Sequence, residues 1–148
     1  MNFIQNINKL SQSIFYQFLF LIFAISFSST SFILQTINEP KCESFLGNFI
    51  RLFHHILLPF LYFGFLIPWT PIFQKIIWLI FIGALFNWLS NNNFCALTQW
   101  ENYFCNLRKD QHFRDITYYW FPQVDDFIVN YRIKVLILYI LIIMVRTM

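Results

Sequence analysis

The chain alternates long apolar runs with short polar segments. An uncharged run covers residues 14–34, and two further apolar runs cover 49–69 and 72–89. A fourth run, 127–145, is interrupted near its start by Asn130, Arg132 and Lys134. About 20 mainly apolar residues are enough for a helix to cross the hydrocarbon of a bilayer. The pattern therefore predicts an all-α membrane protein, in which residues 1–148 form a single integral membrane domain with a bundle of four transmembrane helices.

The segment 90–126 is the one long extramembrane stretch that this pattern leaves between the third and fourth spans. Within it, apolar side chains at helical spacing predict a short amphipathic helix on the membrane surface; they are Ala96, Leu97, Trp100, Tyr103, Phe104 and Leu107. Thr98 and Glu101 have the spacing of a capping box at the start of this helix. A second short helix is predicted between Phe113 and Phe121.

The first apolar run has two interpretations, because its second half contains the small hydroxylated residues of the segment 26–31. Small polar residues allow neighbouring transmembrane helices to approach closely, so this face could pack inside the bundle. Alternatively, the run is a signal peptide that is cleaved after Ser28, which would leave three spans.

Composition narrows the class of protein further. Hydrophobic residues make up 58% of the 148 residues and charged residues only 11%, whereas about 25% of a soluble domain is charged. A soluble enzyme is excluded, because a water-soluble globule needs more polar surface. The net charge of +3 comes with no dense basic cluster, so no nucleic-acid partner is expected. The expected partners are the lipid bilayer and a membrane protein or a second copy of the chain.

Basic residues fall unevenly on the two sides of a four-span bundle. Seven lie at the end that carries the loop 90–126, and three lie at the end that carries both termini; the first group is Lys41, Arg51, Arg108, Lys109, Arg114, Arg132 and Lys134, and the second is Lys9, Lys75 and Arg146. The excess of basic residues predicts that the loop end is cytoplasmic. Arg51, near the end of the second span, is expected to extend to the lipid headgroups.

Three cysteines are present, Cys42, Cys95 and Cys105, so at least one is unpaired within a monomer. This number favours a reducing compartment or a simple structural use over a disulfide framework.

The segment Cys95-Ala96-Leu97-Thr98-Gln99-Trp100-Glu101-Asn102 resembles a motif of a known family. Small bacterial multi-pass membrane proteins of unknown function carry Cys-Pro-Leu-Thr-x-x-Glu-Asn directly after a transmembrane hairpin, and membrane proteins of large DNA viruses show a related pattern. The resemblance covers roughly residues 49–145 and implies a shared fold. It brings no activity or cofactor with it, and both a host and a viral membrane are compatible with it. Ala96 stands where the family usually has proline.

His54 and His55 are the candidate functional residues inside a span, because ionisable groups in a membrane are often functional. Together with Cys95 and Glu101 they could form a membrane-embedded redox or metal-dependent site. The alternative is structural: one histidine bonds to a neighbouring helix, and Cys95 is a buried apolar residue. No cofactor or metal motif is present at a recognisable spacing. We therefore expect a structural or accessory membrane protein that acts through helix packing and partner binding, with the enzyme as the alternative.

Overall fold

The computed structural model describes the backbone of residues 3–92, 94–109 and 111–147, and the side chains of these residues except 3–9 and 146–147. The chain is all-α, which confirms the predicted fold class. The elements in order are α1 (Phe3–Asn38), α2 (Phe45–Phe63), the short 3-10 helix η1 (Gly64–Leu66), α3 (Pro71–Ser90), α4 (Ala96–Phe104), α5 (Ile116–Trp120) and α6 (Pro122–Thr147).

Four of these helices are long and apolar enough to cross a membrane. The candidate spans are Leu10–Asn38, Phe45–Leu66, Pro71–Ser90 and Pro122–Val145, where the sequence predicted 14–34, 49–69, 72–89 and 127–145. The last helix begins earlier than predicted because Pro122 can occupy a first helical turn, which places Asp125 in that turn. Large apolar side chains lie exposed along the spans, including Ile25 (67%), Leu79 (71%) and Val145 (76%). Such surfaces suit lipid as the surrounding medium.

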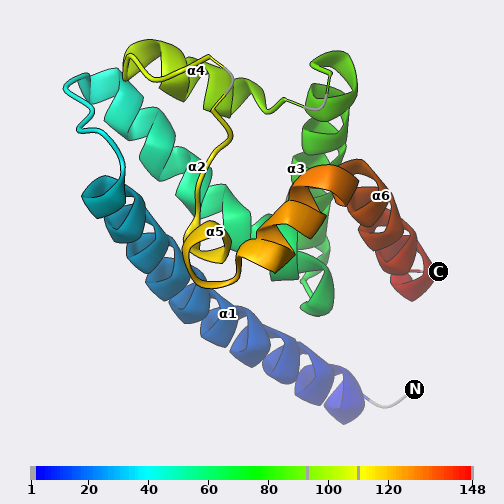
Figure 1. The fold of residues 1–148 in the computed structure, drawn as a ribbon. Coiled ribbons are helices and arrows are strands. Elements are labelled where there is room, and N and C mark those ends of the chain that lie inside the picture. Colours follow the sequence, from blue (N-terminus) through cyan, green and yellow to red (C-terminus); the bar gives the residue numbers. More distant parts are fainter. Residues whose placement is uncertain (1–2, 93, 110, 148) are drawn as a thin grey trace.

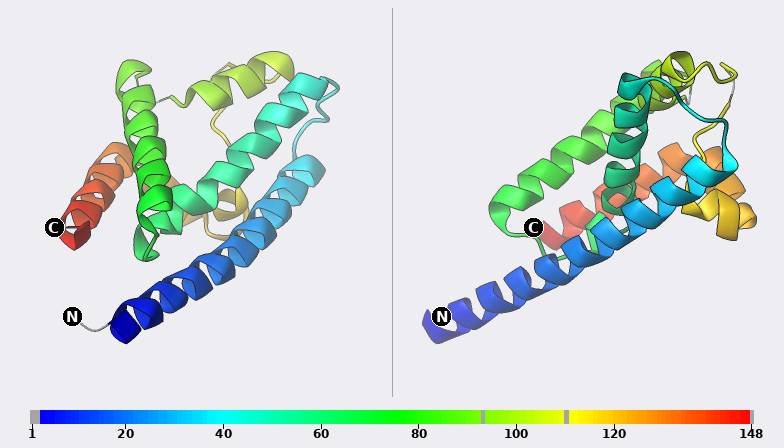
Figure 2. Two further views of the ribbon diagram at one scale, coloured as in Figure 1. Left: turned by 180° about the vertical axis from the view of Figure 1, so that it is seen from behind. Right: turned by 90° about the vertical axis from the view of Figure 1, so that its left-hand side faces the viewer.

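The helices form two groups joined at α2. Helix α1 lies alongside α2, and α3 packs against α6 around a core of Ile77, Phe81, Leu136 and Ile143 (Figure 1). Helix α4 lies across the N-terminal part of α2, and α5 connects α1 to α6. The first turns of α1 and the last turns of α6 lie away from α4 (Figure 2).

Helix α4 forms where the sequence predicted an amphipathic helix, but the details of its N-terminus differ. Cys95 is the N-cap residue and makes no side-chain capping bond, so the predicted capping box of Thr98 and Glu101 is wrong. Both of these residues lie inside the helix and are buried, with 3% and 1% exposed. The apolar side chains Trp100 and Tyr103 point outward, as expected for a helix at a membrane surface.

Candidate functional site

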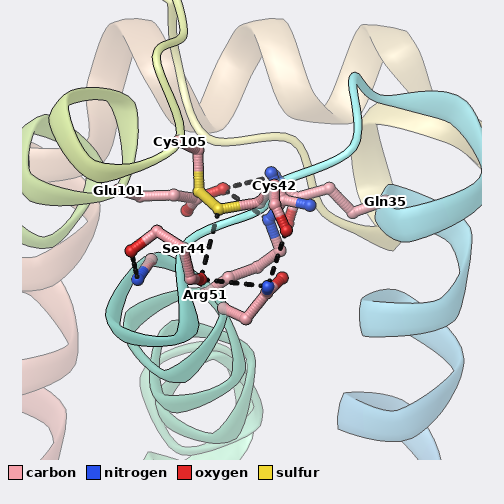
Figure 3. The surroundings of a disulfide bond; sticks show 8 residues. Gln35, Cys42, Ser44, Arg51, Glu101 and Cys105 are labelled. Carbon is pink, nitrogen blue, oxygen red and sulfur yellow. Dashed lines mark hydrogen bonds and ion pairs between the residues drawn. A yellow bond between two sulfur atoms is a disulfide. The ribbon is translucent and has the colours of Figure 1, made fainter.

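A buried network of polar side chains joins three helices at the loop end of the bundle. Arg51 of α2 donates from Nε to Glu101 Oε1 of α4 at 2.8 Å, and Gln35 of α1 donates to the same oxygen at 2.9 Å. His55 Nε2 lies 2.7 Å from Gln35 Oε1. All four side chains are at most 2% exposed. The network fastens α4 to α1 and α2, and Figure 3 shows Gln35, Arg51 and Glu101 meeting beside a disulfide.

The prediction that Arg51 extends to the headgroups is therefore wrong. A guanidinium in a span must be paired or exposed to water, and Glu101 supplies the pairing carboxylate from α4. Burial raises the pKa of Glu101 above its ordinary value, while the charge of Arg51 and the hydrogen bonds from Arg51 and Gln35 oppose that shift. The pair is incompletely satisfied, because Arg51 Nη2 and Glu101 Oε2 are buried without a hydrogen-bond partner.

The small hydroxylated residues of α1 face the bundle interior in part, which agrees with their interpretation as a packing face. Pro59 lies inside α2 and has no N–H to donate to the carbonyl of His55. The hydroxyl of Ser28 donates to this carbonyl oxygen at 2.9 Å instead. Ser31, which is fully buried, accepts from the backbone N–H of Ile116 at 2.9 Å. Both contacts give a hydrogen bond to a backbone group that lipid tails could not supply.

Cys42 and Cys105 form a disulfide that joins the α1–α2 loop to the end of α4. The preference for unpaired cysteines, which came from their number, is thus wrong for this pair, and only Cys95 is a free thiol. Two of the basic residues that the sequence analysis assigned to the sides of the bundle, Lys9 and Arg146, have side chains outside the described part of the chain.

Gly47, in the first turn of α2, allows the disulfide to pass close to the helix backbone. A Cβ at this position would lie 2.5 Å from Cys105 Sγ and 2.6 Å from Cys42 Sγ. These separations are shorter than van der Waals contact, and the sulfur atoms are covalently fixed. Glycine is therefore required by the close approach and not by its backbone angles, because no glycine here has a positive φ.

We predict that Gly47→Ala lowers the fraction of protein carrying the Cys42–Cys105 bond and destabilises the fold by about 1–3 kcal/mol, as overpacking does. Gly83→Ala is the matched control, because a Cβ at Gly83 meets nothing within 4 Å. Electrophoresis with and without reductant, after alkylation of free thiols, measures the paired fraction. Equal pairing in the two variants would show that Gly47 is not needed for the disulfide.

A second cluster holds the segment after α4 against the end of α1. Glu39 is 8% exposed and forms an ion pair with Arg114. It also accepts from Gln111 Nε2 at 2.7 Å and from the Tyr119 hydroxyl at 3.3 Å. Although partial burial lowers the pKa of Arg114, its hydrogen bond to Glu39 and the charge of Glu39 raise that pKa overall. Burial and the charge of Glu39 likewise raise the pKa of Tyr119.

Cys95 and His54 are brought together, as the sequence-based enzyme hypothesis required. Cys95 Sγ lies 3.7 Å from His54 Nε2, and the imidazole of His54 stacks on the Phe113 ring with centroids 3.7 Å apart. His55 and Glu101, the other members of that hypothesis, are bound within the buried network instead. No group of three or more His, Cys, Asp or Glu side chains in the described part of the chain is placed to hold a metal ion.

The remaining motif residues have separate positions. Asn102 is buried and donates to the backbone carbonyl of Gln111 at 2.7 Å. Leu97 is half-buried, and Trp100 is 55% exposed.

Sequence reasoning did not single out Gln35, Glu39 or Asp115, which are all buried and all hydrogen-bonded. The sequence did hold one signal for Gln35, which is the spacing of the polar residues along the first span. The structure shows that Gln17, Ser28, Ser31 and Gln35 are all buried on α1. Their spacing places 28, 31 and 35 on one face of a helix. Polar residues on one face of a span indicate the side that packs inside the bundle.

Comparisons of the chain with protein-family models, with curated proteins and with solved structures found no match.

Proposed function

We propose that this multi-pass membrane protein is a structural or accessory protein, which acts by packing against a partner in the membrane. One observation carries the proposal: Glu101 binds Arg51 and Gln35, and Gln35 in turn binds His55, so these polar groups are held in one buried network. A catalytic acid or base has to reach a substrate, whereas these groups are used to hold α4 on the bundle. For the same reason, Glu101 and His55 are not free to act as catalytic groups or ligands in the alternative, a redox or metal-dependent enzyme.

The outer face of α1 offers the surface for such a partner. Ile22 and Ile33 are 48% and 54% exposed, and Ser26 and Ser29 between them are also exposed. These four positions recur at spacings of three and four residues and therefore share one side of the helix. Small hydroxylated residues facing lipid permit a close approach by another transmembrane helix.

The proposal predicts a cross-link from this face in native membranes. A photoreactive amino acid at position 29 should capture a second polypeptide, whereas the same amino acid at Leu138, an exposed residue of α6, should not. The mass of the product distinguishes a second copy of the chain from a different membrane protein. A strictly monomeric purified protein with no cross-link from position 29 would contradict the proposal.

The resemblance of residues 95–102 to the motif of the small bacterial family belongs to the same proposal. Glu101 and Asn102 of the motif make buried contacts that hold the extramembrane segment. This supports a structural role for the motif in proteins that share it, with no reaction implied.

A further inference from the structure

A cavity of about 400 Å³ lies between α2, α3 and α6. Apolar side chains form most of its wall; they include Leu57 and Leu61 of α2, Ile80 and Ala84 of α3, and Leu136 and Tyr139 of α6. The volume is in the range of small-molecule sites in proteins. Along α3 the lining residues run from Leu79 to Trp88, which is about 14 Å at 1.5 Å per residue.

Two exposed side chains of the candidate spans form part of the cavity wall. Phe53 and Leu79 both line it and are 44% and 71% exposed, and both belong to candidate spans. Water would find few polar partners along the apolar part of the wall, and a buried water needs two to four of them. In a bilayer the medium around these two side chains is hydrocarbon, so an alkyl chain is the occupant that fits the apolar part.

The part of the wall near α4 has a different chemistry. His54, Cys95 and Thr98 line it there. Two side chains of opposite charge on α6, Arg132 and Asp125, also belong to the wall of the cavity, and Asp125 lies beside the start of α5. The guanidinium of Arg132 lies over the Trp88 ring at 5.7 Å from its centroid, and Asp125 accepts a hydrogen bond from Thr117 Oγ1 at 3.2 Å. The structure therefore places a cation and an anion in the wall of a mainly apolar chamber.

A third charged group in the wall, Asp115, is already engaged. Its carboxylate accepts from the Tyr62 hydroxyl at 2.6 Å and from the backbone N–H of Thr117 at 2.7 Å. Asp125 accepts one hydrogen bond, from Thr117, and Arg132 Nε is buried without a hydrogen-bond partner. We assign these two charged groups of the wall to a ligand, and a headgroup that complements both must itself carry both signs.

We propose that this cavity binds a zwitterionic phospholipid, with one acyl chain between α2, α3 and α6. The phosphate of the headgroup lies toward Arg132, and its ammonium group lies toward Asp125. This site goes beyond the proposed accessory function, because it assigns the bundle a specific lipid and does not depend on a protein partner.

The test reconstitutes the protein in vesicles of equal parts phosphatidylcholine and phosphatidylglycerol, extracts it in mild detergent and measures the retained lipid by native mass spectrometry. Wild type should keep one phosphatidylcholine in at least tenfold excess over phosphatidylglycerol. Ala84→Phe, which fills the chamber, should lose at least nine-tenths of this lipid. Ile82→Phe is the matched control and should keep it, because Ile82 is exposed on α3 and does not line the cavity.

Further variants test two points: whether a loss of lipid comes from misfolding, and whether Asp125 sets the headgroup preference. Gly83→Leu repeats the filling from a position with open space at its Cβ, and an intact Cys42–Cys105 bond verifies the fold of each variant. Asp125→Asn should shift the preference toward the anionic lipid. Equal retention by Ala84→Phe and Ile82→Phe in folded protein, or no preference between the two lipids in wild type, would overturn the proposal.

Discussion

Replacing Glu101 by alanine is expected to destabilise the protein by about 3–5 kcal/mol, because it leaves the guanidinium of Arg51 buried without its partner. Arg51 is 1% exposed and donates from Nε to Glu101 Oε1 at 2.8 Å. The Gln35 amide also loses the oxygen to which it donates. Glu43→Ala is the matched control, because Glu43 is an exposed carboxylate in the adjacent loop. Unfolding in a denaturing detergent, monitored through the release of α4 from the bundle, measures the difference in stability.

A double substitution distinguishes the loss of an ion pair from the loss of packing. Arg51→Met combined with Glu101→Leu removes both charges and should recover most of the stability lost by Glu101→Ala. A double variant as unstable as the single one would show that packing, and not the unpaired charge, dominates. A single variant as stable as Glu43→Ala would contradict the role of the network.

Replacing Cys105 by serine is expected to lower stability by about 2–4 kcal/mol. The bond closes a loop with a sequence separation of 63, for which chain entropy alone gives about 4 kcal/mol. The lower part of the range applies because spans that remain helical in lipid already restrict the reduced chain. Cys95→Ser is the control, because Cys95 is a free, half-buried thiol. Thermal unfolding of the two variants in the same detergent measures the effect, and equal midpoints would contradict it.

The spans were predictable because lipid imposes one simple requirement on them. A helix in a bilayer satisfies its own backbone, so its length and apolar character are visible in the sequence alone. The boundary between the second and third predicted spans, 49–69 and 72–89, lies close to the observed one, where Pro71 occupies the first turn of α3. The exact ends were less predictable: α1 extends to Asn38 because polar residues such as Gln35 continue the helix once they are buried against a neighbour.

The contacts of the polar residues were not predictable in the same way. The spacing of Thr98 and Glu101 suits a local capping box, but Glu101 binds Arg51 and Gln35, which are 50 and 66 positions away in the sequence. Such pairings depend on how the helices pack. Helix α4 has the apolar face that the sequence predicts, but Trp100 and Tyr103 of that face are exposed. Its buried residues are polar: Thr98, Glu101 and Asn102. Beside a membrane, apolar groups can face lipid while polar groups seek partners inside the protein.

The side of the membrane on which the loops lie is where the sequence and the structure disagree. The count of basic residues predicts a cytoplasmic loop end, whereas the Cys42–Cys105 bond favours an oxidising compartment. One of the seven basic residues counted at this end, Arg51, is buried in the network and does not lie in a loop. We expect the disulfide to be the better guide to orientation, because a covalent bond has to form in its own compartment.

Labelling with a membrane-impermeant maleimide tests this four-span arrangement and its disulfide most directly. Intact cells and inside-out vesicles are labelled with and without an impermeant reductant, and the modified cysteines are identified by mass spectrometry. Cys42 and Cys105 should gain label only after reduction, both from the same face of the membrane, and in intact cells. Label on either residue without reductant, or label on the two residues from opposite faces, would contradict the account.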